Sequence, residues 1–262
     1  MADGITASSI LATRSSSIQL KDRVAIVTGG FGGIGQAVVT HLASLGAKLV
    51  ISDLVTSQLT PALSSTGAVV FKADISDPAQ VKALFDFAET TFNTPPHILV
   101  NCAGVSDPTF ATISTTSLEI FDHVMSTNTN GSFLCCREAA NRMRRGSGGR
   151  IICVTSSQVG LPSPGYGPYT MSKAAVEVMV KILAKELKGT GITANCVAPG
   201  PIATKMFFAG KTEEMVNGVI NLNPLNRLGQ PEDVAPVIGF LASDSGEWIN
   251  GQIIRVNGGY VV

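Results

Sequence analysis

From Arg23 onward the chain alternates between two patterns of hydrophobic residues. Short runs rich in β-branched residues are separated by longer stretches in which apolar residues recur at helical spacing. Several of the short runs are apolar throughout, as expected of strands that are covered on both faces. The pattern predicts strands at 24–28, 48–52, 69–72, 98–101, 150–155, 193–197 and 252–256.

The helical stretches fall between these strands. They cover residues 33–45, 78–91, 118–145, 169–187 and 232–242, with a break near Asn128 in the third. Asp77 before Pro78 is typical of a helix N-cap followed by proline at the first helical position. Strands that alternate with helices predict an α/β fold with a doubly wound parallel sheet of about seven strands. We expect one domain over 21–262, preceded by a disordered tail over 1–20.

Composition narrows the class of partner. The 262 residues contain 19 Lys plus Arg and 19 Asp plus Glu. The chain therefore has no net positive charge that would attract nucleic acid or an anionic membrane. No apolar run reaches the roughly 18 residues of a membrane span. The five cysteines lack CxxC spacing and the three histidines form no ligand pair, so we expect reduced thiols and no metal site. The expected partner is a small molecule that is uncharged, or whose charge is met locally.

The first 20 residues are rich in Ser, Thr and Ala, and they lack the apolar core of a secretory signal. Reduced thiols and the absence of such a signal predict a cytoplasmic protein. A short organellar transit peptide, and therefore a plastid location, is the alternative.

Glycines crowd the turn between the first predicted strand and helix. Backbone amides at a helix start attract anions, and glycines admit a pyrophosphate where a β-carbon would collide. The turn therefore predicts a dinucleotide-phosphate cradle, with a flexible glycine loop as the alternative. Its residues are Thr28-Gly29-Gly30-Phe31-Gly32-Gly33-Ile34-Gly35. Two registers are open, GxGxxG from Gly30, Gly32 and Gly35, or TGxxxGxG from Gly29, Gly33 and Gly35.

Asp53 follows the second predicted strand, 20 residues after Gly33. An acidic residue at this separation can accept hydrogen bonds from an adenosine ribose, and its charge repels the 2′-phosphate of NADP. Gly32 and Leu54 stand where an arginine or lysine would have welcomed that phosphate. The pattern favours NAD as the cofactor and leaves NADP as the alternative. Asp53 could also be a solvated carboxylate at the end of a strand, without a role in cofactor binding.

Tyr169 and Lys173 are four residues apart at the start of a predicted helix, so they share one face. A nearby ammonium favours the phenolate and pulls the tyrosine pKa down from about 10. Such a pair can donate and accept a proton, although an exposed surface pair has the same spacing. The surrounding motifs decide between the two.

Together these motifs resemble the short-chain dehydrogenase/reductase family over about residues 21–262. The matching motifs are Thr28-Gly29-x3-Gly33-x-Gly35, Asn101-Cys102-Ala103-Gly104, Asn128, Ser157 and Tyr169-x3-Lys173. Further matches are Asp74-Ile75, Pro199-Gly200 with Ile202 and Thr204, and Val256-Asn257-Gly258-Gly259. The resemblance selects the TGxxxGxG register and implies a Rossmann fold. The segments 184–189 and 195–204 are similar to plant members described as NADPH-dependent aldehyde reductases.

The resemblance also implies roles for four residues. Tyr169 would be the general acid of carbonyl reduction and the general base of alcohol oxidation, and Ser157 would hydrogen-bond the substrate oxygen. Lys173 would hold the nicotinamide ribose and lower the tyrosine pKa together with the cationic ring of NAD⁺. Asn128 would position a water between the lysine and solvent. The glycine turn, Asp53, Asp74, Ile75, Asn101, Ala103, Gly104, Pro199, Gly200, Ile202 and Thr204 would bind the cofactor.

Two serines follow the fifth predicted strand. The pattern Ser-x-x-Gly, which ends at Gly160, favours Ser157 as the substrate donor. Ser157 lies 12 positions before Tyr169, where a separation of 13 is commoner. We choose Ser157 over Ser156; the plain structural interpretation makes both serines caps at the strand end. A further departure from the family is Cys102, which stands where a second asparagine is usual.

Substrate choice is expected in the segments 105–113, 158–168 and 206–219. Candidate pocket residues are Gln158, Tyr166, Met206, Phe207 and Phe208. Their mostly apolar character predicts a lipophilic aldehyde, ketone or alcohol. A substrate lid is expected near 204–222, where the same aromatics could simply pack a helix. The helix at 169–187 is apolar around much of its circumference, and with the family resemblance this predicts a homodimer or homotetramer.

Three functions remain open. The first is a nicotinamide-dependent alcohol dehydrogenase or carbonyl reductase, with an NADPH-dependent aldehyde or ketone reductase as its closest variant. The second is a cyclase or isomerase that keeps the cofactor pocket. The third is a regulator that binds NAD without catalysis, against which the complete set of Asn128, Ser157, Tyr169 and Lys173 argues.

Overall fold

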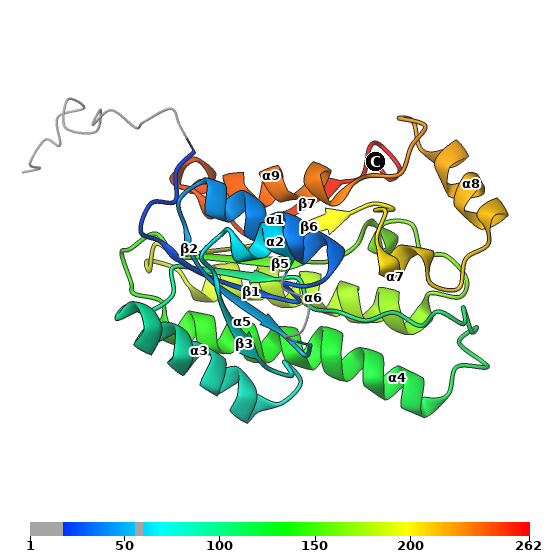
Figure 1. Cartoon of the computed structure of the whole chain (residues 1–262). Helices are drawn as coiled ribbons and strands as arrows, with labels where there is room; N and C mark the ends of the chain where they lie inside the picture. Colours follow the sequence, from blue (N-terminus) through cyan, green and yellow to red (C-terminus); the bar gives the residue numbers. More distant parts are fainter. Residues whose placement is uncertain (1–17, 56–59) are drawn as a thin grey trace, which may run out of the picture.

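Seven parallel strands form a single sheet in the order β3-β2-β1-β4-β5-β6-β7 (Figure 1). The computed structural model describes residues 18–55 and 60–262. The strands are β1 (Val24–Thr28), β2 (Lys48–Asp53), β3 (Val69–Lys72), β4 (Ile98–Asn101), β5 (Arg150–Val154), β6 (Thr193–Pro199) and β7 (Ile253–Val256). All seven predicted strands are confirmed, with ends that differ by at most two residues. The predicted tail at 1–20 lies almost entirely outside the described residues.

Helices cover both faces of the sheet (Figure 1). The helices α1 (Gly33–Ser44) and α9 (Pro231–Ala242) pack together on one face. The opposite face carries α3 (Pro78–Phe92), α5 (Gly131–Arg142) and α6 (Gly167–Glu186). Each face has its own buried apolar cluster, because a parallel sheet of this kind is covered on both sides. The predicted doubly wound α/β fold is therefore confirmed.

The predicted break near Asn128 is also confirmed. The helix α4 (Leu118–Met125) passes into a π-helical turn, η2 (Ser126–Asn130), before α5 begins. The wider turn places Asn128 inside the protein, where it is fully buried. A π-helical turn of this kind is frequently found at functional sites.

Three short helices were not predicted as such. The helix α2 (Pro61–Ser64) follows β2, and α7 (Lys205–Phe208) and α8 (Glu213–Leu222) follow β6. Each begins after a threonine whose side chain accepts a hydrogen bond from a backbone amide of the first turn. The last two occupy the segment in which a lid was expected. None of the helices in the described ranges combines the length and apolarity needed to span a bilayer.

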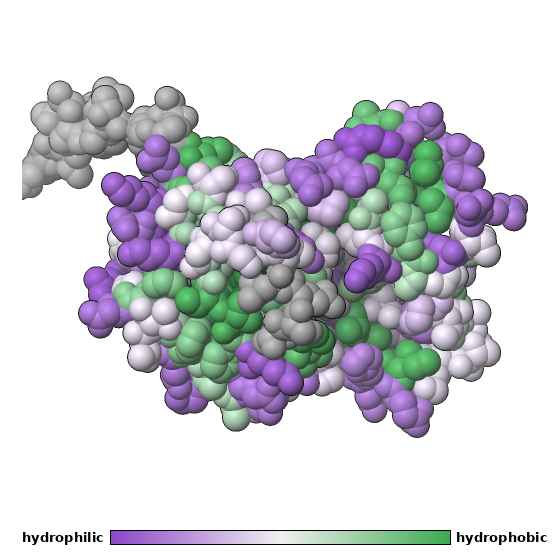
Figure 2. Space-filling model, in the orientation of Figure 1, coloured by the Kyte–Doolittle hydropathy of each residue, from purple (hydrophilic) through white to green (hydrophobic). Residues whose placement is uncertain are grey.

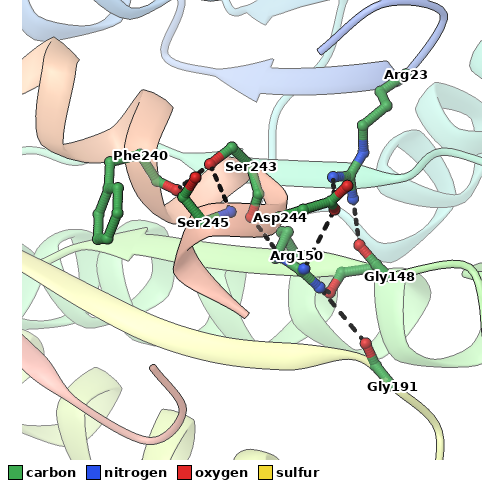
Figure 3. A network of polar contacts seen from close by, with 9 residues as sticks. Arg23, Gly148, Arg150, Gly191, Phe240, Ser243, Asp244 and Ser245 are labelled. Carbon is green, nitrogen blue, oxygen red and sulfur yellow. Dashed lines mark hydrogen bonds and ion pairs between the residues drawn. The ribbon is translucent and has the colours of Figure 1, made fainter. Parts of the chain in front are cut away.

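The amino ends of β1 and β5 are joined by an arginine network (Figure 3). The side chain of Arg150 is 1% exposed, and its Nε donates to the carbonyl of Ser243 at 3.2 Å. The Asp244 carboxylate lies 3.1 Å from an Arg23 nitrogen and 3.6 Å from an Arg150 nitrogen. One exposed aspartate therefore faces two guanidinium groups, of which one is buried.

Candidate active site

The glycine turn between β1 and α1 is shaped by close backbone contacts. Gly29 has a φ of +62°, and a β-carbon on Gly35 would overlap the Gly29 carbonyl. A β-carbon on Gly33 would lie 2.7 Å from a side-chain carbon of Thr204. These three positions need glycine for steric reasons, which agrees with the TGxxxGxG register. The turn opens at the carboxyl end of β1, beside β4, where the strand order reverses and open α/β sheets bind ligands.

Asp53 holds this turn as well as facing the cavity. One carboxylate oxygen accepts from the amide of Phe31 at 3.0 Å, and the other accepts from the amide of Leu54 at 2.8 Å. Because the carboxylate lies at the end of β2 against the glycine turn, its negative charge is fixed there. Its predicted role in binding the adenosine ribose stays a prediction.

Asn101 supports the next turn from below. Thr28 Oγ1 donates to Asn101 Oδ1 at 2.5 Å, and Asn101 Nδ2 donates to Ser132 at 2.8 Å. Thr28 Oγ1 also accepts from the amide of Ala103 at 3.3 Å. The asparagine is 2% exposed and does not line the cavity. Its place is thus structural, which differs from the direct cofactor contact that the sequence predicts.

A cavity of about 1020 Å³ runs from the glycine turn to the lid segment. It is lined by the other predicted cofactor residues, which are Gly29, Phe31, Gly33, Ile34, Gly35, Asp53, Asp74, Ile75, Ala103, Gly104, Tyr169, Lys173, Pro199, Gly200, Ile202 and Thr204. Gln158, Tyr166, Met206 and Phe207 of the predicted substrate pocket also line it. Phe208 does not, because its ring is packed edge-on against Phe207 and is about half exposed.

Tyr169 and Lys173 lie on one face of α6 inside this cavity. The Lys173 ammonium is 5.8 Å from the centre of the Tyr169 ring and donates to the carbonyl of Val154 at 2.9 Å. Lys173 is 4% exposed, so the interpretation as an exposed surface pair is wrong. The helix therefore carries a phenol and a buried cation into the same enclosed space.

Burial dominates the electrostatics of this pair in the chain itself. It raises the pKa of Tyr169, and a side-chain hydrogen bond with Ser156 lowers that pKa in part. Burial also lowers the pKa of Lys173. The predicted lowering of the Tyr169 pKa by Lys173 together with the cationic ring of NAD⁺ stays a prediction. The phenol is consequently protonated at neutral pH and can act as an acid.

Both serines that follow β5 line the cavity, and the side chain of Ser156 lowers the pKa of Tyr169 by hydrogen bonding. Ser157 is 3% exposed; its Oγ donates to the carbonyl of Ala198 at 2.9 Å and accepts from Asn257 Nδ2 at 3.1 Å. The difference between the two serines is local: a short 3₁₀-helix, η3 (Ser157–Val159), begins directly after Ser156, and the Ser157 hydroxyl lies against Ala198 and Asn257. The structure therefore favours Ser156 as the neighbour of Tyr169, and the choice of Ser157 as the substrate donor stays a prediction.

Asn128 braces two sides of the site. Its Oδ1 accepts from the amide of Val105 at 2.8 Å, and its Nδ2 donates to the Val105 carbonyl at 2.9 Å and to Ser172 Oγ at 3.0 Å. Ser172 Oγ in turn donates to the carbonyl of Tyr169 at 2.7 Å. The side chain therefore links the loop after β4 to the catalytic face of α6. Its predicted role in holding a water stays a prediction.

Several lining residues carry no motif in the sequence. Cys102 faces the cavity, and burial raises the pKa of its thiol to about 12, so it stays protonated. Tyr260 near the C-terminus, and Met215, Val219 and Leu222 on α8, complete the apolar wall. Lys211, from the loop between α7 and α8, reaches the same space. Within the described residues no group of acidic, histidine and cysteine side chains is arranged to hold a metal ion.

The residues present fit a nicotinamide dinucleotide. The glycine turn leaves the amino end of α1 open to an anion, and Asp53 stands at the carboxyl end of the adjacent β2 strand. At the far end the same cavity holds a proton donor and a buried ammonium. Its volume is at the upper end of the roughly 300–1,000 Å³ typical of small-molecule sites.

Comparisons with known proteins agree with this geometry. A family described as enoyl-(acyl carrier protein) reductase matches residues 29–261. A short-chain type dehydrogenase/reductase of Picea abies is 53% identical, with 92% of this chain and 93% of the relative aligned. The chain is a short-chain dehydrogenase/reductase.

Other members of the short-chain dehydrogenase/reductase family are also similar. An Arabidopsis thaliana protein named NADPH-dependent aldehyde reductase-like protein, chloroplastic, is 55% identical over 96% of this chain and 100% of the relative. The solved short-chain dehydrogenase/reductase of Serratia marcescens has a TM-score of 0.85 at 31% identity, covering 93% of this chain and 99% of that chain. This short-chain dehydrogenase/reductase is therefore a nicotinamide-dependent oxidoreductase with the Rossmann fold.

Proposed function

We propose that this enzyme interconverts a lipophilic alcohol with its aldehyde or ketone and prefers NAD over NADP. The observation that carries the proposal is the cavity itself. It places Ser156, Tyr169 and Lys173 at one end and the glycine turn with Asp53 at the other. An oxygen-bound proton and a carbon-bound hydride can thus be exchanged within one enclosed site.

The proton chemistry belongs to the chain. Tyr169 gives its proton to the carbonyl oxygen during reduction and removes the hydroxyl proton during oxidation. Ser156 hydrogen-bonds the same oxygen and stabilises the phenolate form of Tyr169. Lys173 anchors the ribose beside the nicotinamide. Asn128 holds the loop at Val105 and the helix at Ser172 in place beside Lys173. The cofactor, when bound, supplies or accepts the hydride.

Cofactor preference is proposed from two residues. The Asp53 carboxylate occupies the end of β2, where a 2′-phosphate would meet uncompensated negative charge. Gly32 offers no cation, although a β-carbon there would meet only the Gly29 carbonyl, at 3.2 Å. The names of the Arabidopsis thaliana relatives indicate NADPH for those proteins. We give the local charge more weight, because a carboxylate facing a phosphate is a direct energetic cost.

The alternative functions differ in product formation and in net cofactor turnover. A cyclase or isomerase would form product without net change in the cofactor, whereas a non-catalytic binder would form none. The Ser156–Tyr169 hydrogen bond and the buried Lys173 favour catalysis, because cofactor binding alone does not require a proton donor at the far end of the cavity.

Assembly and location are part of the proposal. Val178 and Ile182 on α6 are each about half exposed, which supports a homodimer or homotetramer built on this helix face. Light scattering at assay concentration measures the mass, and a monomer rejects the assembly. Two Arabidopsis thaliana relatives are named chloroplastic, which supports a plastid location over the cytoplasm. Fusion of residues 1–20 to a fluorescent protein tests this in plant cells.

The central experiment measures turnover by the absorbance of reduced cofactor. Aldehydes, ketones and their alcohols of increasing chain length are screened with both cofactors, and specificity constants are compared. The proposal expects net cofactor oxidation or reduction with lipophilic substrates and a higher constant with NAD(H). The variant Tyr169→Phe should bind cofactor normally and lose turnover by orders of magnitude. Near-native turnover in that variant would reject the mechanism.

A further inference from the structure

Lys211 lies in an aromatic cage at the substrate end of the cavity. Its ammonium is 4.6 Å from the ring centre of Phe207, 4.9 Å from that of Phe110 and 5.7 Å from that of Tyr166. The three rings come from different segments, namely α7, the loop after β4 and the loop before α6. A cation at these distances is attracted by the electron-rich faces of the rings.

The cage is held in place by backbone packing. Gly210 has a φ of +72°, and a β-carbon there would overlap the carbonyl of Pro108. A β-carbon on Gly165 would lie 2.9 Å from Phe110. Both glycines allow the lid and the two loops to meet closely. The fold therefore fixes the position of Lys211, which is not a freely moving side chain on the surface.

The charge of Lys211 has no acidic partner among the described residues. Its one hydrogen bond goes to the carbonyl of Phe207, at 2.6 Å, although an ammonium has three donors. Asp107 lines the adjoining small cavity with Lys211, but its carboxylate accepts from the amide and hydroxyl of Thr109 at 2.9 and 2.8 Å. Burial lowers the pKa of Lys211, as expected of a cation partly removed from water.

Lys211 and Tyr169 line the same cavity. The surrounding wall is apolar, with Met206, Phe207 and Met215 close by in the lid. We propose that Lys211 recognises a carboxylate on an otherwise lipophilic carbonyl or alcohol substrate. This inference rests on the proposed function and narrows its substrate class. Two free donors suit one carboxylate, and the aromatic rings suit the apolar body that joins it to the reacting carbon.

Both charges of the proposed pair are partly removed from water in this site. A carboxylate that enters this site loses part of its hydration, and a charge-assisted hydrogen bond to the ammonium compensates it. The cation is already partly desolvated and held by the rings, so binding requires little further ordering. A neutral substrate of the same shape leaves the two donors unused and gains only the apolar contacts.

The test crosses the charge of the substrate with the charge of the residue. Specificity constants are measured for 4-formylbenzoate and for its uncharged methyl ester, with reduced cofactor at saturation. We expect the native enzyme to prefer the acid. Lys211→Met should reduce the constant for the acid by roughly tenfold or more, the range of one hydrogen bond to a charged group. The ester should change by less than about threefold, and Lys211→Arg should keep most of the preference.

The controls separate the outcomes. Lys188→Met removes one exposed charge just beyond the carboxyl end of α6, away from the cavity, and should leave the acid-to-ester ratio unchanged. Two results for Lys211→Met would overturn the proposal, and both leave the acid-to-ester ratio unchanged. Equal losses for acid and ester would give the lysine a purely structural role, and no loss for either would show that it does not contact the substrate.

A binding measurement makes the inference independent of turnover. The affinity of 4-hydroxymethylbenzoate for the enzyme with NAD⁺ is compared with that of its methyl ester by fluorescence titration. Weaker binding of the acid alone in Lys211→Met supports carboxylate recognition even where no hydride is transferred, and equal binding rejects it. Absence of hydride transfer from every substrate, by contrast, rejects the proposed function.

Discussion

The Ser156 side chain forms a hydrogen bond with the Tyr169 phenol, whereas the hydroxyl of the next residue, Ser157, is held between Ala198 and Asn257. Two adjacent serines thus have different surroundings. The first contacts the proton donor, and the second ties the carboxyl end of β6 to the C-terminal segment. The two serines form a matched pair for mutagenesis.

We expect Ser156→Ala to lower kcat by about 10²-fold or more, the range of one positioned hydrogen-bond donor at a reacting oxygen. Ser157→Ala should keep kcat within a few-fold and instead lower the melting temperature, because Asn257 loses a buried partner. Steady-state kinetics and thermal unfolding of both variants check this. The opposite assignment of the two effects would restore Ser157 as the substrate donor.

The pH dependence should have opposite signs in the two directions. Burial raises the pKa of Tyr169, so the base form required for alcohol oxidation becomes available only as the pH rises. Oxidation should therefore accelerate from pH 7 upward, while carbonyl reduction, which needs the protonated phenol, should decline at high pH. Specificity constants measured from pH 6 to 10 in both directions test the sign. Oxidation that is fastest at the lowest pH would contradict the role of Tyr169.

Cofactor preference should be reversible at two positions. Gly32 has extended backbone angles, φ −70° and ψ 162°, which any residue can adopt, so Gly32→Arg is compatible with the turn. Combined with Asp53→Asn, it should shift the NADP-to-NAD ratio of specificity constants toward NADP by about tenfold or more, because a charge repulsion is replaced by a charge-assisted hydrogen bond. Gly32→Gln with Asp53→Asn, which lacks the added charge, is the matched control. A native enzyme that already prefers NADP would refute the carboxylate argument.

Gly104 should tolerate no side chain beside the catalytic lysine. A β-carbon there would lie 3.1 Å from the Lys173 ammonium and 3.2 Å from Asn128 Oδ1. Gly104→Ala should lower kcat while the protein remains folded, because the two polar groups must move apart. Circular dichroism and kcat together measure this.

Asp244 should contribute to stability far from the active site. Asp244→Asn leaves the buried Arg150 and the neighbouring Arg23 without their shared carboxylate (Figure 3). We expect the free energy of unfolding to fall by about 1–3 kcal/mol, since Arg23 loses a hydrogen bond to a charged group and the buried Arg150 loses a nearby opposite charge. Chemical denaturation measures the change, and activity at 25 °C should persist. Asp22→Asn is the control, because its ion pair with Lys48 is exposed and worth roughly 0–1 kcal/mol.

Composition alone predicted little about the site. Figure 2 shows polar and apolar side chains interspersed over one face of the molecule. Balanced charge argued against nucleic acid as a partner, but it could not indicate a local cation. Lys211 has no motif around it, and only the convergence of α7 and two loops gives it a cage.

The sequence by itself determined the layered fold, because strand and helix periodicity and the glycine spacing at Gly29, Gly33 and Gly35 are local properties. It also determined that Tyr169 and Lys173 share a face, since four residues make about one helical turn. Only the tertiary structure decided which serine side chain lies against the tyrosine, that burial raises the tyrosine pKa, and that Lys211 faces the cavity. These depend on contacts between segments far apart in the chain, and on the water that those contacts exclude.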